Sequence, residues 1–445
     1  MTDETAEKTL VDRLLGVFSD VRRGEGSHAV LMLVSLFLLM VSYYVLKTVR
    51  EPLILAGGSA EPKSYAAAAQ AGVLMLFVPV YSALANRVDR PKLIAGTLVA
   101  FLACLQGFYF LGVSAAPSWL GVVYYIWVGI FSVAAIAQFW SLANDLYSKD
   151  QGERLFPIIG IGMTGGAAAG SYLSKVLFDT GLGPYTLMQV AAGLLLAHLI
   201  LTMIANASWT SASDKSEAQK MDGANGFLLV LTRPYIRLIA ILLILLNVVN
   251  TTGEYLLGQL VVDAALVATD GSEAAVGAWI GSFYGDFFFW VNIAAVSLQA
   301  LFVSRLVKWF GITAVLFALP IVAIGVYGGL AAGASFVLYR WLKTAENSTD
   351  YSVMNTAKNM LWLPTSRDEK YKAKQAVDTF FVRLGDVISA GIVFVGTTYL
   401  ALNTTQFALV NVFIIGLWLL VSWRLVIRYK ALAEEKGLNA PEETA

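Results

Sequence analysis

The sequence is poor in the residues from which most active sites and metal sites are built. Its 445 residues include one cysteine, Cys104, and two histidines, His28 and His198. One cysteine excludes a disulfide framework and a thiolate metal site. Two histidines leave little material for a zinc site or a Ser/His/Asp hydrolase. We therefore expect no catalytic residues, no metal site and no cofactor, and we predict that the chain is not an enzyme.

Charge is also scarce, and it is balanced. Asp, Glu, Lys and Arg make up 14% of the chain, against about 25% in an ordinary soluble domain. Lys+Arg and Asp+Glu each number 31, so the formal net charge is zero. Zero net charge removes any overall electrostatic reason to bind nucleic acid, and we expect no such partner. Hydrophobic residues reach 58% and the mean hydropathy is +0.68, which indicates a polytopic membrane protein embedded in a lipid bilayer.

Twelve apolar runs are long enough to cross a bilayer as helices, which takes roughly 20 residues each. The polar stretch 208–225 divides them into two groups of six, an arrangement typical of the major facilitator architecture. We therefore predict an all-α fold with twelve transmembrane helices in two six-helix halves. The predicted spans are 28–54, 65–86, 93–114, 119–146, 155–178 and 184–206, then 236–262, 283–304, 310–332, 335–362, 376–400 and 405–423.

The same pattern predicts the domain organisation and the topology. Most of the 31 basic residues fall in segments that are cytoplasmic when the N-terminus is inside. Residues 1–26 lack the apolar core and cleavage site of a signal peptide. We expect a multi-pass protein of the bacterial inner membrane with both termini in the cytoplasm, and leave its oligomeric state open. The predicted domains are a cytoplasmic segment 1–27, a six-helix bundle 28–207, a cytoplasmic linker 208–235, a second bundle 236–429 and a cytoplasmic tail 430–445.

Charged residues inside the spans indicate where a solute could pass. A lipid-facing basic residue near the midplane costs about 2.5–3.5 kcal/mol, so most should face protein or a water-filled cavity. Spans two, three, six, nine and twelve lack charge, and four of these are the outer supports of the facilitator arrangement. Span ten places a row of mostly polar side chains on one helical face, which either lines a transport path or forms internal salt bridges. These residues are Arg340, Lys343, Asn347, Asp350, Met354 and Lys358, with Glu346 at the edge of the face.

Several motifs resemble those of one family. Residues 44–53 read Tyr-Val-Leu-Lys-Thr-Val-Arg-Glu-Pro-Leu, residues 139–144 read Phe-Trp-Ser-Leu-Ala-Asn, and residues 153–160 hold a basic-aromatic-Pro-x-x-Gly pattern. The longest motif runs from Asp350-Tyr-Ser through Lys358-Asn-Met to Pro364, and on to Lys374-Gln-Ala-Val-Asp. Together these segments resemble the ATP/ADP antiporters, or nucleotide translocases, of plastids and intracellular bacteria.

The resemblance implies a facilitator-type fold and transport of a nucleotide, often ATP exchanged for ADP. It implies that Lys47 and Arg50 match two cations of span one, and that Glu254 matches an acid of span seven. Two departures weaken the ATP/ADP inference. A family Glu of span four falls on Val128, and a family Lys of span eleven falls on Asp386, with Arg383 three residues earlier.

We therefore predict a secondary transporter that moves an anionic, nucleotide-like or phosphorylated solute by alternating access, with exchange as one mode. The alternative is a proton-coupled carrier of another small metabolite or drug, in which the acids relay protons. We expect Arg50 and Arg383 to be the principal anion contacts, although Arg383 could instead pair with Asp386 or Asp378. The predicted solute-binding residues are Lys47, Arg50, Asn144, Lys343, Asn347, Lys358 and Arg383. The predicted coupling residues or internal ion pairs are Glu254, Asp286, Glu346, Asp350, Asp378 and Asp386.

Overall fold

The computed structural model describes residues 10–16, 19–85, 87–209, 226–366 and 369–435. All regular elements in these ranges are helices. Residues 210–225 of the predicted linker lie outside the described residues, as do parts of the predicted terminal segments.

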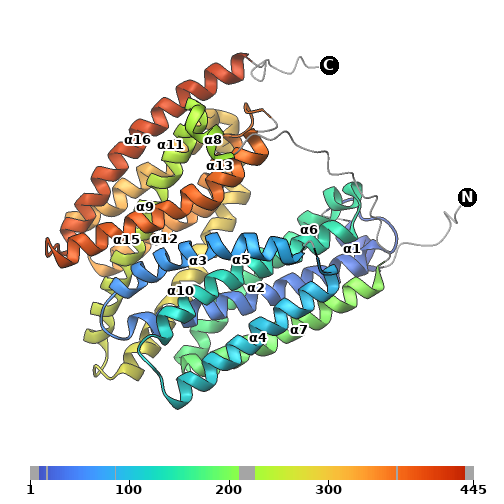
Figure 1. The fold of residues 1–445 in the computed structure, drawn as a ribbon, viewed down its shortest axis with the longest axis horizontal. Coiled ribbons are helices and arrows are strands. Elements are labelled where there is room, and N and C mark those ends of the chain that lie inside the picture. Colours follow the sequence, from blue (N-terminus) through green and yellow to red (C-terminus); the bar gives the residue numbers. More distant parts are fainter. Residues whose placement is uncertain (1–9, 17–18, 86, 210–225, 367–368, 436–445) are drawn as a thin grey trace, which may run out of the picture. The chain divides into compact units, whose positions relative to one another are not determined.

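Each predicted span corresponds to a helix or to a pair of helical segments (Figure 1). In the first half these are α2 (Glu25–Leu55), α3 (Glu61–Ala85), α4 (Arg90–Ser114), α5 (Leu120–Leu146), α6 (Lys149–Asp179) and α7 (Pro184–Ser208). In the second half they are α9 (Pro234–Ala268), α10 (Glu273–Leu298), α11 (Ser304–Ala331), α12 (Phe336–Thr349) with α13 (Asn355–Met360), α14 (Lys374–Ala376) with α15 (Val382–Thr398), and α16 (Thr404–Glu435). Two short helices, α1 (Leu10–Leu15) and α8 (Gly226–Thr232), precede the two halves.

Among the described residues, four π-helical turns interrupt the second half: η1 (Gln299–Val303), η2 (Asp350–Met354), η3 (Glu369–Ala373) and η4 (Val377–Phe381). Single π turns inside helices are frequent at functional sites. Three of them fall within predicted spans: η1 in span eight, η2 in span ten and η4 in span eleven.

Nine stretches of the described residues are long and apolar enough to cross a membrane. One of them, Glu273–Ala331, contains two predicted spans, α10 and α11. The chain bends at Gly311, where φ is 62° and a side chain would be strained. The remaining predicted spans, α6 and α12 with α13, are not among the nine, because α6 is rich in glycine and α12 is rich in polar residues.

The chain forms two compact units. Unit 1 comprises Met1–Gly57, Leu76–Ala218 and Thr269–Phe289, and unit 2 comprises Gly58–Met75, Gln219–Ala268 and Trp290–Ala445. Each unit thus contains most of one predicted bundle together with the start of one helix from the other half, α10 in unit 1 and α3 in unit 2. The domain boundaries read from the sequence stay a prediction.

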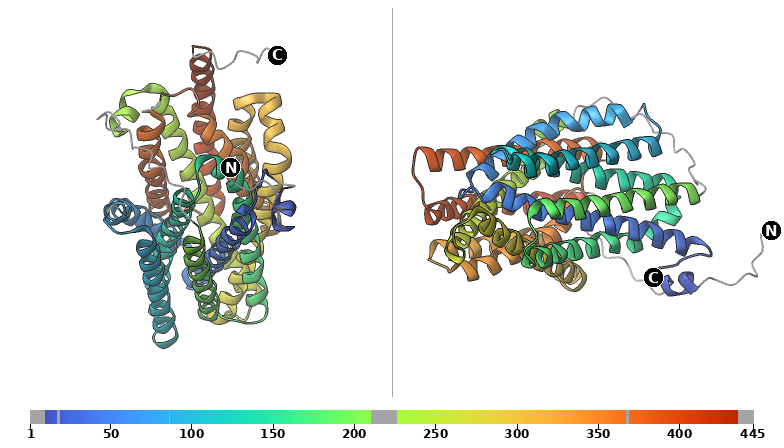
Figure 2. Two further views of the ribbon diagram at one scale, coloured as in Figure 1. Left: turned by 90° about the vertical axis from the view of Figure 1, so that its right-hand side faces the viewer. Right: turned by 90° about the horizontal axis from the view of Figure 1, so that it is seen from below.

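Unit 1 is organised around α2, which runs beside α6 and α7 (Figures 1 and 2). The contact with α6 is close because Gly162, Gly166 and Gly170 recur every fourth residue. A methyl group at Gly166 would lie 2.5 Å from the carbonyl oxygen of Phe37, and one at Gly170 would lie 2.7 Å from that of Val41. Small residues at such spacing let membrane helices approach closely. These three glycines therefore have the packing role that their positions on one helical face suggest.

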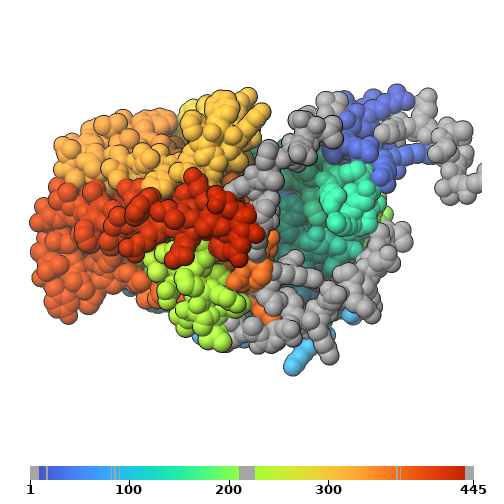
Figure 3. Space-filling view, turned by 90° about the horizontal axis from the view of Figure 1, so that it is seen from above, coloured from blue at the N-terminus to red at the C-terminus, as the bar shows by residue number. Residues whose placement is uncertain are grey.

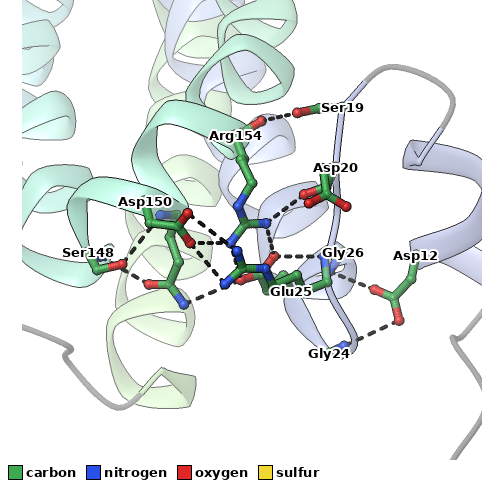
Figure 4. Close-up of polar contacts among 11 residues, drawn as sticks. Asp12, Ser19, Asp20, Gly24, Glu25, Gly26, Ser148, Asp150 and Arg154 are labelled. Carbon is green, nitrogen blue, oxygen red and sulfur yellow. Dashed lines mark hydrogen bonds and ion pairs between the residues drawn. The ribbon is translucent and has the colours of Figure 1, made fainter. Parts of the chain in front are cut away.

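The start of α2 is held by a polar cluster that we call the α2 clamp: Asp12, Glu25 and Arg154 (Figure 4). Asp12 of α1 accepts hydrogen bonds from the backbone N–H of Gly24 at 3.3 Å and of Gly26 at 2.9 Å. Arg154 of α6 donates to both carboxylate oxygens of Glu25, at 2.7 and 2.9 Å. The clamp satisfies backbone donors that a helix N-terminus otherwise leaves unpaired and fastens α1 and α6 to α2.

In unit 2, α9 packs against α15 and α16, and α11 packs against α12 and α16. The N-terminus of α12 is capped by the hydroxyl of Ser335, which accepts from the N–H of Leu338 at 3.3 Å. This arrangement brings the polar residues of α9, α12 and α15 into one unit.

Candidate functional site

Two predicted binding residues of unit 1, Lys47 and Arg50, lie near the end of α2 against aromatic rings. The Arg50 guanidinium lies 4.1 Å from the centroid of the Tyr125 ring and pairs with Glu51 at 2.6 Å. The Lys47 ammonium lies 4.2 Å from the centroid of the Phe288 ring. Cation–π contacts hold a positive charge in place without neutralising it. Arg50 keeps N–H donors beyond those that Glu51 accepts.

The other predicted residues of unit 1 lie apart from this pair in the chain. Asn144 is exposed near the end of α5. Asp286 is half-buried on α10, one turn after Ser282, which donates a hydrogen bond to Asp179 of α6. Asp179 also pairs with Lys175 at 2.5 Å. The start of α10 is thus fastened to the end of α6 by polar contacts.

In unit 2, Lys343 and Glu346 form a buried ion pair on α12. The ammonium of Lys343 lies 2.7 Å from Glu346 Oε2 and 3.2 Å from the hydroxyl oxygen of Tyr327. Tyr327, on α11, donates to Glu346 at 3.0 Å. The Lys343 side chain is 0% exposed. The sequence left two roles open for the polar face of span ten, a transport path or internal salt bridges. At Lys343 and Glu346 the structure shows an internal salt bridge. Solute binding by Lys343 stays a prediction.

A second polar contact lies one turn along the same helix. Asn347 donates to Glu254 of α9 at 3.2 Å, and Lys63 pairs with the other oxygen of Glu254 at 3.2 Å. The predicted spans 28–54 and 65–86 place Lys63 in the loop between them. The structure places it instead in the first turn of α3, which begins at Glu61, and its side chain is 3% exposed.

Asp386 is the residue that replaces a cation of the resembling family. It is buried on α15 and accepts hydrogen bonds from Thr251 at 2.7 Å and Asn247 at 2.8 Å, both on α9. Arg383 reaches it at 3.3 Å. The predicted alternative, a pair between Arg383 and Asp386, is thus present. Arg383 uses one N–H group in this contact and its side chain is 30% exposed.

A cavity of about 280 Å³ in unit 2 gathers further predicted residues. Lys358 pairs across it with Asp350 at 3.1 Å, and Lys374 donates to Asn359 at 3.1 Å. The π-helical turns η2 and η4 place Asp350 and Asp378 at this cavity. Its lining consists of Leu243, Leu246, Asn247, Asn250, Asp350, Asn355, Lys358, Asn359, Trp362, Lys374, Asp378 and Val382.

Four contributors to the polar contacts and the cavity in unit 2 were missed from the sequence. Asn247, Asn250 and Thr251 recur at three- and four-residue steps, so their shared face on span seven was a readable signal. Tyr327 lies in a span without charge, and nothing in the local sequence distinguishes it from a packing residue.

Comparison with known proteins identifies the relatives of this chain. Residues 288–429 match the family model described as TLC ATP/ADP transporter. ADP,ATP carrier protein 1 of Chlamydia pneumoniae is 22% identical over 385 residues, which cover 74% of this chain and 72% of that protein. ADP,ATP carrier protein 1 of Chlamydia trachomatis is 23% identical over 427 residues, with 84% and 77% covered. These findings confirm the resemblance predicted from the motifs.

The fold also matches a solved structure. The crystal structure of the nucleoside transporter NupG superposes with a TM-score of 0.60 over 91% of this chain and 99% of that chain, at 12% sequence identity. The likeness confirms the predicted all-α, major facilitator-like fold of a multi-pass membrane protein. The matched proteins are carriers, which confirms that this chain is a secondary transporter and not an enzyme.

Proposed function

We propose that this chain exchanges ATP and ADP across the bacterial inner membrane by alternating access. The observation that carries the proposal is the family match over residues 288–429. That segment contains α12 to α15, and with them Lys343, Asn347, Lys358 and Arg383. The named relatives carry ADP and ATP, and cationic side chains next to a cavity supply the attraction that a phosphorylated solute needs.

In unit 2 we assign phosphate contact to Lys358 and Arg383. Lys358 is 31% exposed at the cavity, and Arg383 keeps N–H donors beyond the one that Asp386 accepts. Arg suits bidentate contact with phosphate. Trp362 lines the same cavity and offers an aromatic face for a base. Asn347, held by Glu254, orders the neighbouring part of α12.

In unit 1 we assign anion contact to Lys47 and Arg50. Both lie against aromatic rings, and Glu51 orients the guanidinium of Arg50. We place Asn144 in the same role as a neutral hydrogen-bond donor, since it is exposed near the end of α5.

The test is uptake of labelled ATP and ADP into intact cells that express the chain. Exchange predicts that uptake rises when the cells or vesicles are preloaded with unlabelled ADP or ATP, and that an uncoupler leaves the initial rate unchanged. Absence of uptake for every nucleotide in a panel would overturn the nucleotide assignment.

The proton-coupled alternative rests on the acids Glu254, Asp286, Asp378 and Asp386. Two of them, Glu254 and Asp386, accept hydrogen bonds inside unit 2. It becomes the conclusion if an uncoupler stops uptake and preloading has no effect.

We place both termini in the cytoplasm, which reporter fusions at residue 445 and before residue 10 would check.

A further inference from the structure

The N-terminal end of α9 and the C-terminal part of α16 enclose a groove in unit 2 that the proposed function does not use. Its volume is about 380 Å³. Figure 3 shows the red C-terminal part of α16 beside the yellow-green segment that contains α8 and the start of α9. We call it the arginine groove, after three of its lining residues: Pro234, Arg237, Leu238, Arg424, Ile427 and Arg428.

The three arginines of the groove carry positive charge that the described residues do not balance. Arg237, Arg424 and Arg428 are all exposed. None of them has a carboxylate within 4.0 Å in the described ranges. The neighbouring Arg233, by contrast, pairs with Glu369 at 3.7 Å. The groove therefore presents three guanidinium groups, each with a planar set of donors that matches a phosphate.

An apolar stripe on α16 leads into the groove. Its members recur at steps of three and four residues, so they share one face of the helix. A contiguous exposed apolar face along a membrane helix is a surface for lipid chains. The stripe ends beside Arg424 and Arg428. Its exposed residues are Leu409, Phe413, Leu417, Leu420, Trp423 and Ile427.

The short helix α8 indicates where this end of unit 2 lies relative to the surface of the lipid bilayer. It ends two residues before Pro234 and exposes Phe227, Leu228 and Leu231. A helix with exposed apolar residues next to charged ones suits the boundary between headgroups and acyl chains. The start of α9 and the end of α16 thus meet at the level of the lipid headgroups, on the side predicted to be cytoplasmic.

We propose that the arginine groove binds the phosphate headgroup of an anionic phospholipid, whose acyl chains lie along the stripe of α16. Basic pockets between transmembrane helices at this level bind anionic headgroups. A free phosphate would use the three arginines and leave the stripe unused, so the stripe favours a lipid as the source of the phosphate. This site is independent of the solute and of the mode of coupling.

The test compares lipids on the full chain in detergent by native mass spectrometry. We expect retention of phosphatidylglycerol over phosphatidylcholine of the same chain length. Three arginines near a membrane surface predict a preference of roughly 100-fold for the anionic lipid. Inorganic phosphate at millimolar concentration should not displace the lipid. Displacement by phosphate would overturn the lipid assignment and leave a free-anion site.

The variant Arg237→Gln/Arg424→Gln/Arg428→Gln should lose this preference. Its matched control, Arg305→Gln/Lys308→Gln, removes basic residues from α11 outside the groove and should keep it. If the triple variant keeps the wild-type preference, the proposal is wrong. If the triple variant does not accumulate, the comparison of the two lipids on the wild-type protein still tests the proposal. Equal retention of both lipids would contradict it.

Discussion

Arg383 joins two roles that the sequence alone could not separate, a structural pair and a solute contact. Asp386 already accepts hydrogen bonds from Thr251 and Asn247, so it stays bonded when Arg383 is removed. We therefore expect Arg383→Gln to insert and keep its thermal stability. Loss of one charge-assisted contact should weaken solute affinity by about 10- to 150-fold. Uptake of labelled ATP at several concentrations measures this loss.

Lys149→Gln is the control for Arg383→Gln, because the Lys149 side chain is 92% exposed and lies outside the proposed site. It should transport as the wild type does. The solute-contact role of Arg383 is contradicted if Arg383→Gln fails to accumulate while Arg383→Gln/Asp386→Asn regains both stability and transport. That outcome would make the residue a structural partner of Asp386.

For the ion pair between Lys343 and Glu346 we expect the opposite of Arg383: removing the cation should lower the stability of the protein. Lys343→Met leaves the Glu346 carboxylate buried without its cation, hydrogen-bonded to the hydroxyl of Tyr327, and breaking a buried pair costs about 3–5 kcal/mol. We expect a clear fall in melting temperature. Lys343→Met/Glu346→Leu should recover most of it, because no charge is left unpaired. A melting temperature that does not change in Lys343→Met, together with lost transport, would show that Lys343 serves the solute instead.

At the scale of elements, the packing of α2 on α6 depends on glycine positions. A side chain at Gly166 would meet the carbonyl oxygen of Phe37 and the Cβ of Met40, at 2.5 and 2.8 Å from its first carbon. We expect Gly166→Leu to lower stability by about 1–3 kcal/mol or more. Gly160→Leu is the matched control, since nothing lies within 4 Å of the added carbon there. Equal melting temperatures for the two variants would contradict this packing role.

The α2 clamp makes a second prediction for elements. Asp12 is 0% exposed and accepts from two backbone N–H groups at the start of α2. Asp12→Ala should cost about 1 kcal/mol, the usual effect of losing an N-cap. Hydrogen exchange at the amides of Gly24 and Gly26 should quicken. Asp20→Ala, which removes a nearby exposed carboxylate, should leave both measurements unchanged.

The apolar runs were enough to predict the helices, because burial in lipid demands long apolar segments with few charges. The residues at which individual helices begin and end were harder to predict. α3 begins before the apolar run, so Lys63 lies in this helix and not in the loop between predicted spans one and two. The polar face of span ten was predicted, but its partners were not. Tyr327, Thr251 and Asn247 come from other helices, and only the packing of those helices brings their hydroxyl and amide groups to Glu346 and Asp386.

For the whole molecule, alternating access predicts that the two ends of the transport path change accessibility in opposite directions. Cys104 is the only cysteine in the sequence, so Cys104→Ser gives a background free of thiols. Asn355→Cys reports on the cavity of unit 2, and Asp263→Cys reports on the other end of α9. Loading with ADP should raise labelling at one position and lower it at the other. Arg383→Gln should reduce both changes. The reason is that the solute shifts the equilibrium between the two access states only through contacts that differ between them. Labelling that stays constant at both positions during verified exchange would rule out this mechanism for the chain.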